Sequence, residues 1–130
     1  MDSEEIWVLG KLNASLVTAM EFPLQTDEVV LTPERATHIR LRHPSDVYLL
    51  EQYGPMAVRS PDYVLLDEKN AETVLLIKNI SDTNCNMVLR LALLTGGNPE
   101  KKKSIMTFHR IRDSYLKRLL SRQKTLYKAE

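Results

Sequence analysis

Apolar residues recur along the chain at two spacings, one typical of strands and one typical of helices. Short apolar runs rich in strand-forming residues predict strands at residues 6–9 and 29–31. Between these runs, the apolar positions of residues 11–22 fit a helical spacing without a clear cap. This part of the chain therefore predicts two strands around one ambiguous segment.

The next segment carries the strongest helix signals of the sequence. Thr32 can cap free backbone N–H groups, and the proline after it suits the first helical position, so a helix is predicted over residues 33–43. Ser45 can cap a second helix that runs to Tyr53, where Gly54-Pro55 is expected to stop it. Two consecutive helices are therefore expected before the second half of the chain.

The second half changes to the alternating pattern of half-buried strands. Strands are predicted at residues 63–66, 73–78, 87–95 and 104–108, with a loop over 79–86, a helix over 111–122 and a last short strand at 124–128. Successive strands with short connections pair most naturally as an antiparallel sheet. The pattern thus predicts an α+β fold, in which N-terminal helices precede a four-stranded antiparallel sheet and a C-terminal helix.

Size and composition indicate one domain over residues 1–130. A chain of 130 residues with 43% hydrophobic and 27% charged residues can bury one core, and no linker-like segment divides it. Its single cysteine, Cys85, cannot form an internal disulfide and is expected to be an inert thiol. The acidic N-terminus is unlike a signal peptide, and no apolar run approaches the roughly 20 residues that span a bilayer. A cytoplasmic protein without a membrane partner is therefore expected.

Charge is distributed unevenly along the chain. Residues 1–100 carry 8 Lys/Arg and 15 Asp/Glu, a balance of −7, whereas residues 101–130 carry 10 and 2, a balance of +8. A basic segment beside an acidic body favours a polyanionic partner for that segment. The alternative is a basic helix that is simply exposed to solvent.

Two histidines on the predicted helix over residues 33–43 are candidates for chemistry. At about 100° per residue, His38 shares a face with Arg42, whereas His43 lies about 140° away on a more apolar face. Arginine matches phosphate oxygens with paired hydrogen bonds, and histidine moves a proton near neutral pH. The His38 face therefore suits phosphate chemistry, and the alternative is a solvent-exposed face with His43 half-buried.

The predicted strands contribute further polar residues. Arg90 lies within the most apolar strand, where a buried guanidinium needs a carboxylate or an anionic ligand as its partner. Lys78 ends the neighbouring strand and is expected near Arg90 if the register permits. In the last strand, Thr107 and His109 are expected to share a face with Ile105 and to contact a phosphate or a nucleotide. The alternatives are an internal salt bridge and strand hydroxyls without a function.

Motifs for several other kinds of chemistry are missing from the sequence. Gly96-Gly97 lacks the lysine and the helix of a phosphate-binding loop, and no Gly-x-Ser-x-Gly elbow occurs. His38 and His43 are five residues apart and no His-Glu-x-x-His pattern occurs, so zinc ligation from this helix is not expected. We therefore expect neither a metal nor a cofactor.

The order of several motifs resembles that of a known nuclease family. The motifs are Leu31-Thr32-Pro33-Glu34-Arg35, His38-Ile39, Arg42-His43-Pro44, Ser60-Pro61-Asp62-Tyr63-Val64-Leu65, Val74-Leu75-Leu76-Ile77-Lys78, Val88-Leu89-Arg90-Leu91, Ser104-Ile105-Met106-Thr107 and Thr125-Leu126-Tyr127-Lys128. Over residues 6–128 they look like the phage-associated branch of the barnase–EndoU–colicin–RelE-like (BECR) nuclease superfamily.

This resemblance implies RNA cleavage without a metal, in which the ribose 2′-hydroxyl attacks the adjacent phosphorus and leaves a 2′,3′-cyclic phosphate. Such chemistry needs a base, an acid and cations that stabilise the phosphorane charge. The resemblance, carried over residue by residue, implies roles for His38, Arg42, His43, Lys78, Arg90, Ser104 and Thr107, and the last strand adds His109 and Arg110. The catalytic residues are His38, Arg42, Lys78, Arg90 and Thr107, and the substrate-binding residues are His43, Ser104, His109 and Arg110.

We favour His38 as the acid or base, because it shares its face with Arg42, and we expect His43 to anchor the helix. The expected function is an endoribonuclease, as a toxin or a phage-encoded effector, with RNA such as tRNA as its substrate and an inhibitor or antitoxin protein as a further partner. The alternative is a catalytically inactive module of the same fold that binds RNA or a protein. Convergence of His38, Arg90 and Thr107 in one cleft distinguishes the enzyme from the module.

Overall fold

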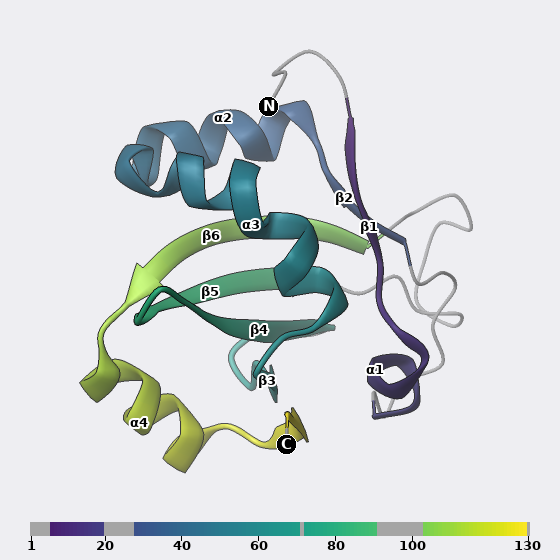
Figure 1. Ribbon diagram of the computed structural model, residues 1–130, viewed down its shortest axis with the longest axis vertical. Coiled ribbons are helices and arrows are strands. Elements are labelled where there is room, and N and C mark those ends of the chain that lie inside the picture. The colour runs from purple at the N-terminus through teal and green to yellow at the C-terminus, as the bar shows by residue number, and fades with distance from the viewer. Residues whose placement is uncertain (1–5, 20–27, 71, 91–102, 130) are drawn as a thin grey trace.

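A seven-stranded sheet organises the chain, with its strands in the order β1-β2-β6-β5-β4-β3-β7 (Figure 1). The computed structural model describes residues 6–19, 28–70, 72–90 and 103–129. The strands are β1 Trp7–Lys11, β2 Glu28–Leu31, β3 Tyr63–Leu66, β4 Thr73–Ile80, β5 Thr83–Arg90, β6 Lys103–Ile111 and β7 Thr125–Lys128. The helices are α1 Ala14–Ala19, α2 Pro33–Arg42, α3 Val47–Arg59 and α4 Asp113–Arg122, with a 3₁₀ turn, η1, over Pro44–Asp46.

Antiparallel pairing joins five of these strands, from β6 through β5, β4 and β3 to β7. The predicted antiparallel sheet is confirmed for the described residues, in which its four strands are β3 to β6, and the predicted strand positions 91–95 lie outside them. The sheet is larger than predicted, because β7 pairs with β3 and the antiparallel β1–β2 pair joins β6. That junction is parallel and short, at Val29↔Lys103 and Val30↔Ser104. The fold is α+β.

The sheet separates two apolar cores, one on each face. On the face that we call the α3 face, Leu76 and Phe108 pack in one cluster with Leu50 of α3. On the opposite face, called the α4 face, Leu75 packs in a second cluster with Leu119 of α4. Because successive side chains of a strand point to opposite faces, each strand residue belongs to one of these two environments.

The predicted helix over residues 33–43 is confirmed as α2. Thr32 has an extended backbone, and its Oγ1 accepts a hydrogen bond from the backbone N–H of Arg35 at 3.3 Å. Ala36 and Ile39 are buried on one side of the helix. Strand β2 pairs with only the beginning of β6, and α2 and η1 lie against β6 further along the strand (Figure 1).

Thr32→Ala should lower the free energy of unfolding by about 1 kcal/mol, because it removes the acceptor that caps α2. Urea denaturation followed by circular dichroism measures this change. Thr37→Ala is the matched control, since Thr37 is exposed within α2 and donates only to the carbonyl of Pro33, at 3.1 Å. Alanine has the higher helix propensity there, so this variant should lose nothing. Equal losses in both variants would contradict the capping role.

Helix α3 runs past Gly54-Pro55, at which the sequence predicted a stop. A Cβ at Gly54 would lie 2.8 Å from Cδ2 of Leu9, so the glycine allows a close approach of α3 to β1. Buried residues in the helical turn after the proline pack against the sheet. The free energy of this packing outweighs the local cost of a proline within a helix. The predicted cap at Ser45 is also wrong, because η1 precedes α3 and no side chain caps it.

Residues 79–86, predicted as a loop, belong to a tight hairpin between β4 and β5. Ser81 and Asp82 form its two-residue turn, and both have a positive φ, of 50° and 64°. Such a turn matches the twist of the flanking strands, so the pairing extends to Ile80↔Thr83. Oδ1 of Asn79 accepts from the backbone N–H of Asp82 at 3.1 Å and stabilises the turn. The usual glycine is missing from this turn, which is why the pattern did not reveal it.

The terminal segments largely follow the prediction. Helix α4 and strand β7 are confirmed, and α4 begins at Asp113 rather than at residue 111. Helix α1 covers only part of residues 11–22, and positions 20–22 lie outside the described residues. Among the described helices, none has the length and apolar composition required to cross a membrane.

Candidate functional site

Two histidines from separate elements stack beside β6. His43 follows α2 as its C-cap, with its backbone N–H bonded to the carbonyl of Ile39 at 2.7 Å, and it lies on the same side of the helix as Ile39. Its ring stacks on the ring of His109 in β6, with ring centroids 4.7 Å apart and planes inclined by 21°. Both residues are half-buried.

A buried carboxylate holds these two histidines together. Asp46 is 7% exposed, and its backbone N–H donates to the carbonyl of His43 at 2.9 Å. Its carboxylate accepts from the backbone N–H of Arg110 at 3.1 Å and from the Nε of the same residue. Because Arg110 directly follows His109, these bonds fasten the turn that carries His43 to the strand that carries His109.

The environment of His109 favours its neutral form. Desolvation is the main cause that lowers its pKa below the usual 6.5, and repulsion from His43 lowers the pKa further, whereas Asp46 acts in the opposite direction. His109 is therefore neutral at pH 7 and can accept a proton. The imidazole of His43 stacks on it and adds a second group at the site that can transfer a proton.

Three buried polar atoms near this stack make no hydrogen bond within the described part of the chain. They are Nδ1 of His109, Oγ1 of Thr107 and Oδ1 of Asn86. Asn86 is the cross-strand partner of His109, and Thr107 lies two residues from His109 on the same face of β6. A buried polar atom without a partner costs about 1–3 kcal/mol. Such groups are uncommon in native structures, and each calls for an explanation such as strain, a catalytic role, or a bound water or ion.

A pocket of about 200 Å³ lies next to these atoms, between the sheet and α4. Asn86, Val88 and His109 line it from β5 and β6, and Tyr115 lines it from α4. Tyr115 is 41% exposed, unlike Leu119 of the same helix, which packs in the α4-face core. The pocket therefore joins the histidine stack to an accessible aromatic ring.

The predicted catalytic residues do not all meet in this region. His38 is half-buried and Arg42 exposed on α2, and His38 lies about 140° around the helix axis from His43. Lys78 lies on the α3 face, because its cross-strand partner Cys85 belongs to the α3-face core. There its Nζ pairs with the carboxylate of Asp62 at 3.5 Å. Lys78 is thus separated by the sheet from the α4 face.

Arg90 and Thr107 lie together on the α4 face, which also carries His109. Thr107 is the cross-strand partner of Val88, and Arg90 follows Val88 by two residues on the same face. In the register of β5 and β6, Arg90 stands opposite Ser104. The expected proximity of Lys78 to Arg90 is wrong, because the two residues alternate to opposite faces. Arg90 and Thr107 are thus neighbours on the sheet face that carries His109, but Arg90 lies four residues along β5 from Asn86, the cross-strand partner of His109, and His38 lies on α2.

A bulge in β6 overturns one prediction about the last strand. The register shifts between Ile105 and Thr107, so one extra residue of β6 separates them. Ile105 is buried in the α3-face core, whereas Thr107 and His109 lie on the α4 face. The predicted face shared by these three residues is therefore wrong. Arg110 returns to the α3 face, where Asp46 binds it.

Cys85 is unsuited to nucleophilic chemistry. Desolvation, followed by the nearby Asp46 carboxylate, raises the pKa of its thiol to about 11, although Arg110 opposes this shift. The thiol therefore stays protonated at neutral pH, and the thiolate that a nucleophile requires is scarce.

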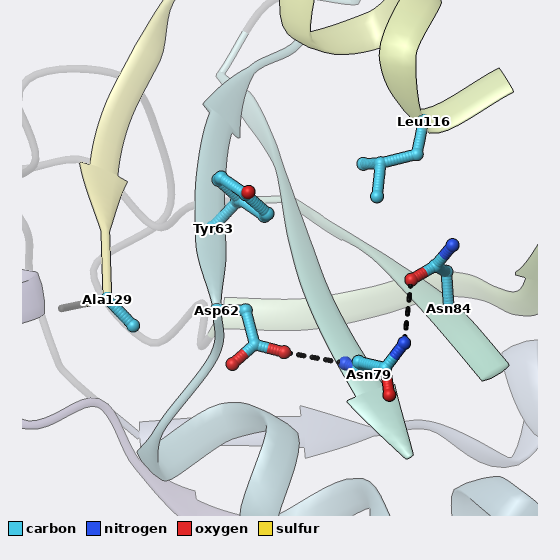
Figure 2. Close-up of a pocket in the computed structure, with 6 residues that line it drawn as sticks. All are labelled: Asp62, Tyr63, Asn79, Asn84, Leu116 and Ala129. Carbon is cyan, nitrogen blue, oxygen red and sulfur yellow. Dashed lines mark hydrogen bonds between the residues drawn. The ribbon is translucent and has the colours of Figure 1, made fainter. Parts of the chain in front are cut away.

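A second pocket, of about 360 Å³, lies beside the β4–β5 hairpin (Figure 2). Its polar side chains bind one another. Oδ2 of Asp62 accepts from the backbone N–H of Asn79 at 2.7 Å, and Nδ2 of Asn79 donates to Asn84 at 3.0 Å. Asn84 in turn donates to Asp113 at 2.6 Å. This network stabilises the hairpin against the start of α4, and it offers a ligand fewer unpaired groups than the pocket at His109.

Comparison of the chain with known proteins finds no match. No protein-family model matches the chain, and no similar curated protein or solved structure is found. Within the described ranges, no group of three or more His, Cys, Asp or Glu side chains is placed to hold a metal ion.

Proposed function

We propose that the protein is an endoribonuclease that cleaves RNA through attack of the ribose 2′-hydroxyl. The observation that carries this proposal is the His43–His109 stack beside the unpartnered Thr107 hydroxyl. Two imidazoles at one site can supply both proton transfers of the reaction. The motif order that resembles the BECR superfamily supports the same chemistry, and membership of that superfamily is part of the proposal.

In this mechanism His109 is the general base and His43 the general acid. His109 takes the proton of the 2′-hydroxyl, whose oxygen forms a bond to phosphorus. The bond between phosphorus and the 5′-oxygen breaks, and the leaving oxygen takes a proton from His43. The products are a 2′,3′-cyclic phosphate and a 5′-hydroxyl. His109 suits the role of base because its lowered pKa keeps it neutral, and the assignment replaces His38, which lies outside the stack.

Positive charge near the site can stabilise the phosphorane. Arg90 lies on the same sheet face as His109. Arg118 and Arg122 are exposed on α4, and both lie on the side of the helix that carries Tyr115. Cations placed where negative charge develops lower the barrier of phosphoryl transfer. An RNA strand that follows α4 would therefore reach the histidine stack along a basic surface.

The purified protein should cleave a mixed-sequence RNA in excess EDTA and should leave 2′,3′-cyclic phosphate ends, because its own imidazoles move the protons. Gel electrophoresis and mass spectrometry of the products measure both results. RNA with a methyl group on every 2′-oxygen is the matched control, since it has no 2′ proton to lose. Cleavage that EDTA abolishes, or that continues on the methylated RNA, would contradict this mechanism.

A second candidate function, RNA binding without cleavage, is favoured by the charge of the C-terminal segment and by the separation of His38 on α2 from Arg90 and Thr107 in the sheet. Residues 101–130 carry a balance of +8, and Lys117, Arg118 and Arg122 are exposed on α4. Absence of cleavage on several RNAs, together with salt-sensitive binding, would support this function in place of the nuclease.

RNA affinity should fall steeply with salt, because each phosphate contact releases counterions. For about three contacts, the loss between about 50 and 200 mM salt should be tens of fold. Fluorescence anisotropy of a labelled RNA measures this slope. The double variant R118Q/R122Q should flatten the slope, whereas Arg59→Gln, at an exposed position of α3, should leave it unchanged. Affinity that is indifferent to salt would rule out the basic surface as the contact.

A further inference from the structure

The pocket next to His109 is lined in a way that suits a flat, partly polar ring. Its volume of about 200 Å³ lies below the roughly 300–1,000 Å³ of sites for drug-sized molecules. Leu75 and Val88 supply apolar side chains from the sheet, and Tyr115 supplies an aromatic ring from α4. Aromatic side chains beside a basic surface stack on nucleobases of any sequence. The pocket therefore has the apolar and aromatic surfaces that a nucleobase requires.

Asn86 provides the pocket with a means of selection. Its side chain is buried, at 3% exposure, and its Oδ1 makes no hydrogen bond within the described residues. A carboxamide pairs with a base edge by accepting from an exocyclic amino group and donating to the neighbouring ring nitrogen, as asparagine does with adenine. Adenine and cytosine present such an edge, whereas guanine and uracil carry a carbonyl oxygen at the position of that amino group and pair with a carboxamide only when the base is placed differently in the pocket. Opposite Oδ1 of Asn86, that carbonyl would leave two acceptors facing each other.

We infer that this pocket binds the base of a nucleotide next to the cleaved phosphate and prefers adenine and cytosine to guanine and uracil. His109 links the two parts of the site, because it lines the pocket and also stacks on His43. A phosphate at the stack therefore has its adjoining base within reach of Asn86. The inference rests on the proposed function and adds a substrate preference to it.

Binding of the four nucleoside 3′-monophosphates tests the pocket without cleavage. Titrations followed by NMR should show that the adenosine and cytidine forms bind about tenfold more tightly, the scale of one well-formed base contact. Asn86→Leu should equalise the four affinities. Its melting temperature should not fall, because the substitution removes a buried acceptor that has no partner.

Two further variants keep this test interpretable. Tyr115→Ala, at an exposed position, should weaken all four nucleotides by roughly tenfold through lost stacking, and it should preserve the preference. Gln52→Leu removes an exposed carboxamide from α3, outside the pocket, and should leave the four affinities unchanged.

A second experiment uses RNA strands that contain a single cleavable ribose and varies the base on either side of it. Its outcomes distinguish the base preference from the nuclease activity. Faster cleavage beside adenine and cytosine, with the preference lost in Asn86→Leu, supports both. Cleavage without a base preference, or with a preference that survives Asn86→Leu, overturns the inference and leaves the nuclease in place. Selective binding that depends on Asn86 without any cleavage supports the pocket and overturns the nuclease. A protein that binds none of the four nucleotides overturns the inference.

Discussion

Replacing His109 with glutamine should slow RNA cleavage by about 10²–10⁴-fold, the usual loss on removal of a general acid or base. Glutamine keeps a polar side chain of similar reach, but it cannot take the proton of the 2′-hydroxyl. Single-turnover cleavage of a mixed RNA measures the rate, and circular dichroism and thermal melting check the fold. His43→Gln should cause a loss in the same range. The double variant should lose little more, because residues that act as a unit are not additive.

His38→Gln is the matched control for these variants, because His38 occupies the same helix as His43 but lies outside the stack. Its cleavage rate should stay close to that of the unchanged protein. A large loss in folded His38→Gln, with little loss in His109→Gln, would return proton transfer to the His38–Arg42 face.

The pH dependence gives an independent check on His109. Its pKa lies below the usual 6.5, so cleavage should persist to lower pH than an ordinary histidine base would allow. The same shift makes a contribution to stability that is present above pH 6.5 and is lost as the pH falls through the pKa of the folded state. His109→Gln should remove this acid-sensitive contribution, which urea denaturation at several pH values measures.

Replacing Asp46 with alanine should lower the free energy of unfolding by about 2 kcal/mol and should also slow cleavage. The substitution removes a nearly buried acceptor from the backbone N–H and the guanidinium of Arg110. The side chain of Arg110 is 47% exposed, so solvent screening keeps the loss below that of a fully buried ion pair. As a positioning residue, Asp46 acts on catalysis by holding His43 beside His109.

Asp62→Ala is the matched control for the loss of Asp46. Asp62 accepts from the backbone N–H of Asn79 at 2.7 Å and pairs with Lys78 at 3.5 Å, in an arrangement like that of Asp46 but away from the stack. Both variants should lose stability, and only Asp46→Ala should lose kcat at saturating RNA, well below either melting temperature. Asp46→Asn keeps an acceptor for the backbone N–H and should recover most of the rate. Equal kcat losses in Asp46→Ala and Asp62→Ala would show that stability alone is responsible.

Most of the described helices and strands could be predicted because their signals are local. Thr32 and the proline that follows it start α2 through a cap and a fixed φ, and alternation identifies β3 and β4. The errors occur where residues that are distant in the sequence determine the local structure. Packing of Gly54 against Leu9 carries α3 through a proline, and a turn without glycine extends the β4–β5 hairpin through the predicted loop. Helix–sheet packing in the first case and strand pairing in the second outweigh local preference.

The residue types of the candidate site could be predicted from the sequence, but which of these residues lie together could not. His43, Arg90, Thr107 and His109 all stood out as polar residues in apolar or helical patterns. Nothing in their spacing indicated that His43, rather than His38, meets His109. Asn86 was missed because it fell within the predicted loop, although its alternation with Val88 on one strand face would have revealed it once the hairpin was recognised.

The sequence by itself determined the α+β class, the positions of most described elements and the basic character of the C-terminal segment, since these depend on spacing, caps and composition over a few residues. Only the tertiary structure decided which side chains meet. Strand order brings the end of α2 beside β6, a bulge turns Thr107 and His109 to the α4 face, and alternation sends Lys78 to the opposite one. These outcomes depend on register and on the burial of two cores at once, and a one-residue shift in register moves every side chain to the other face.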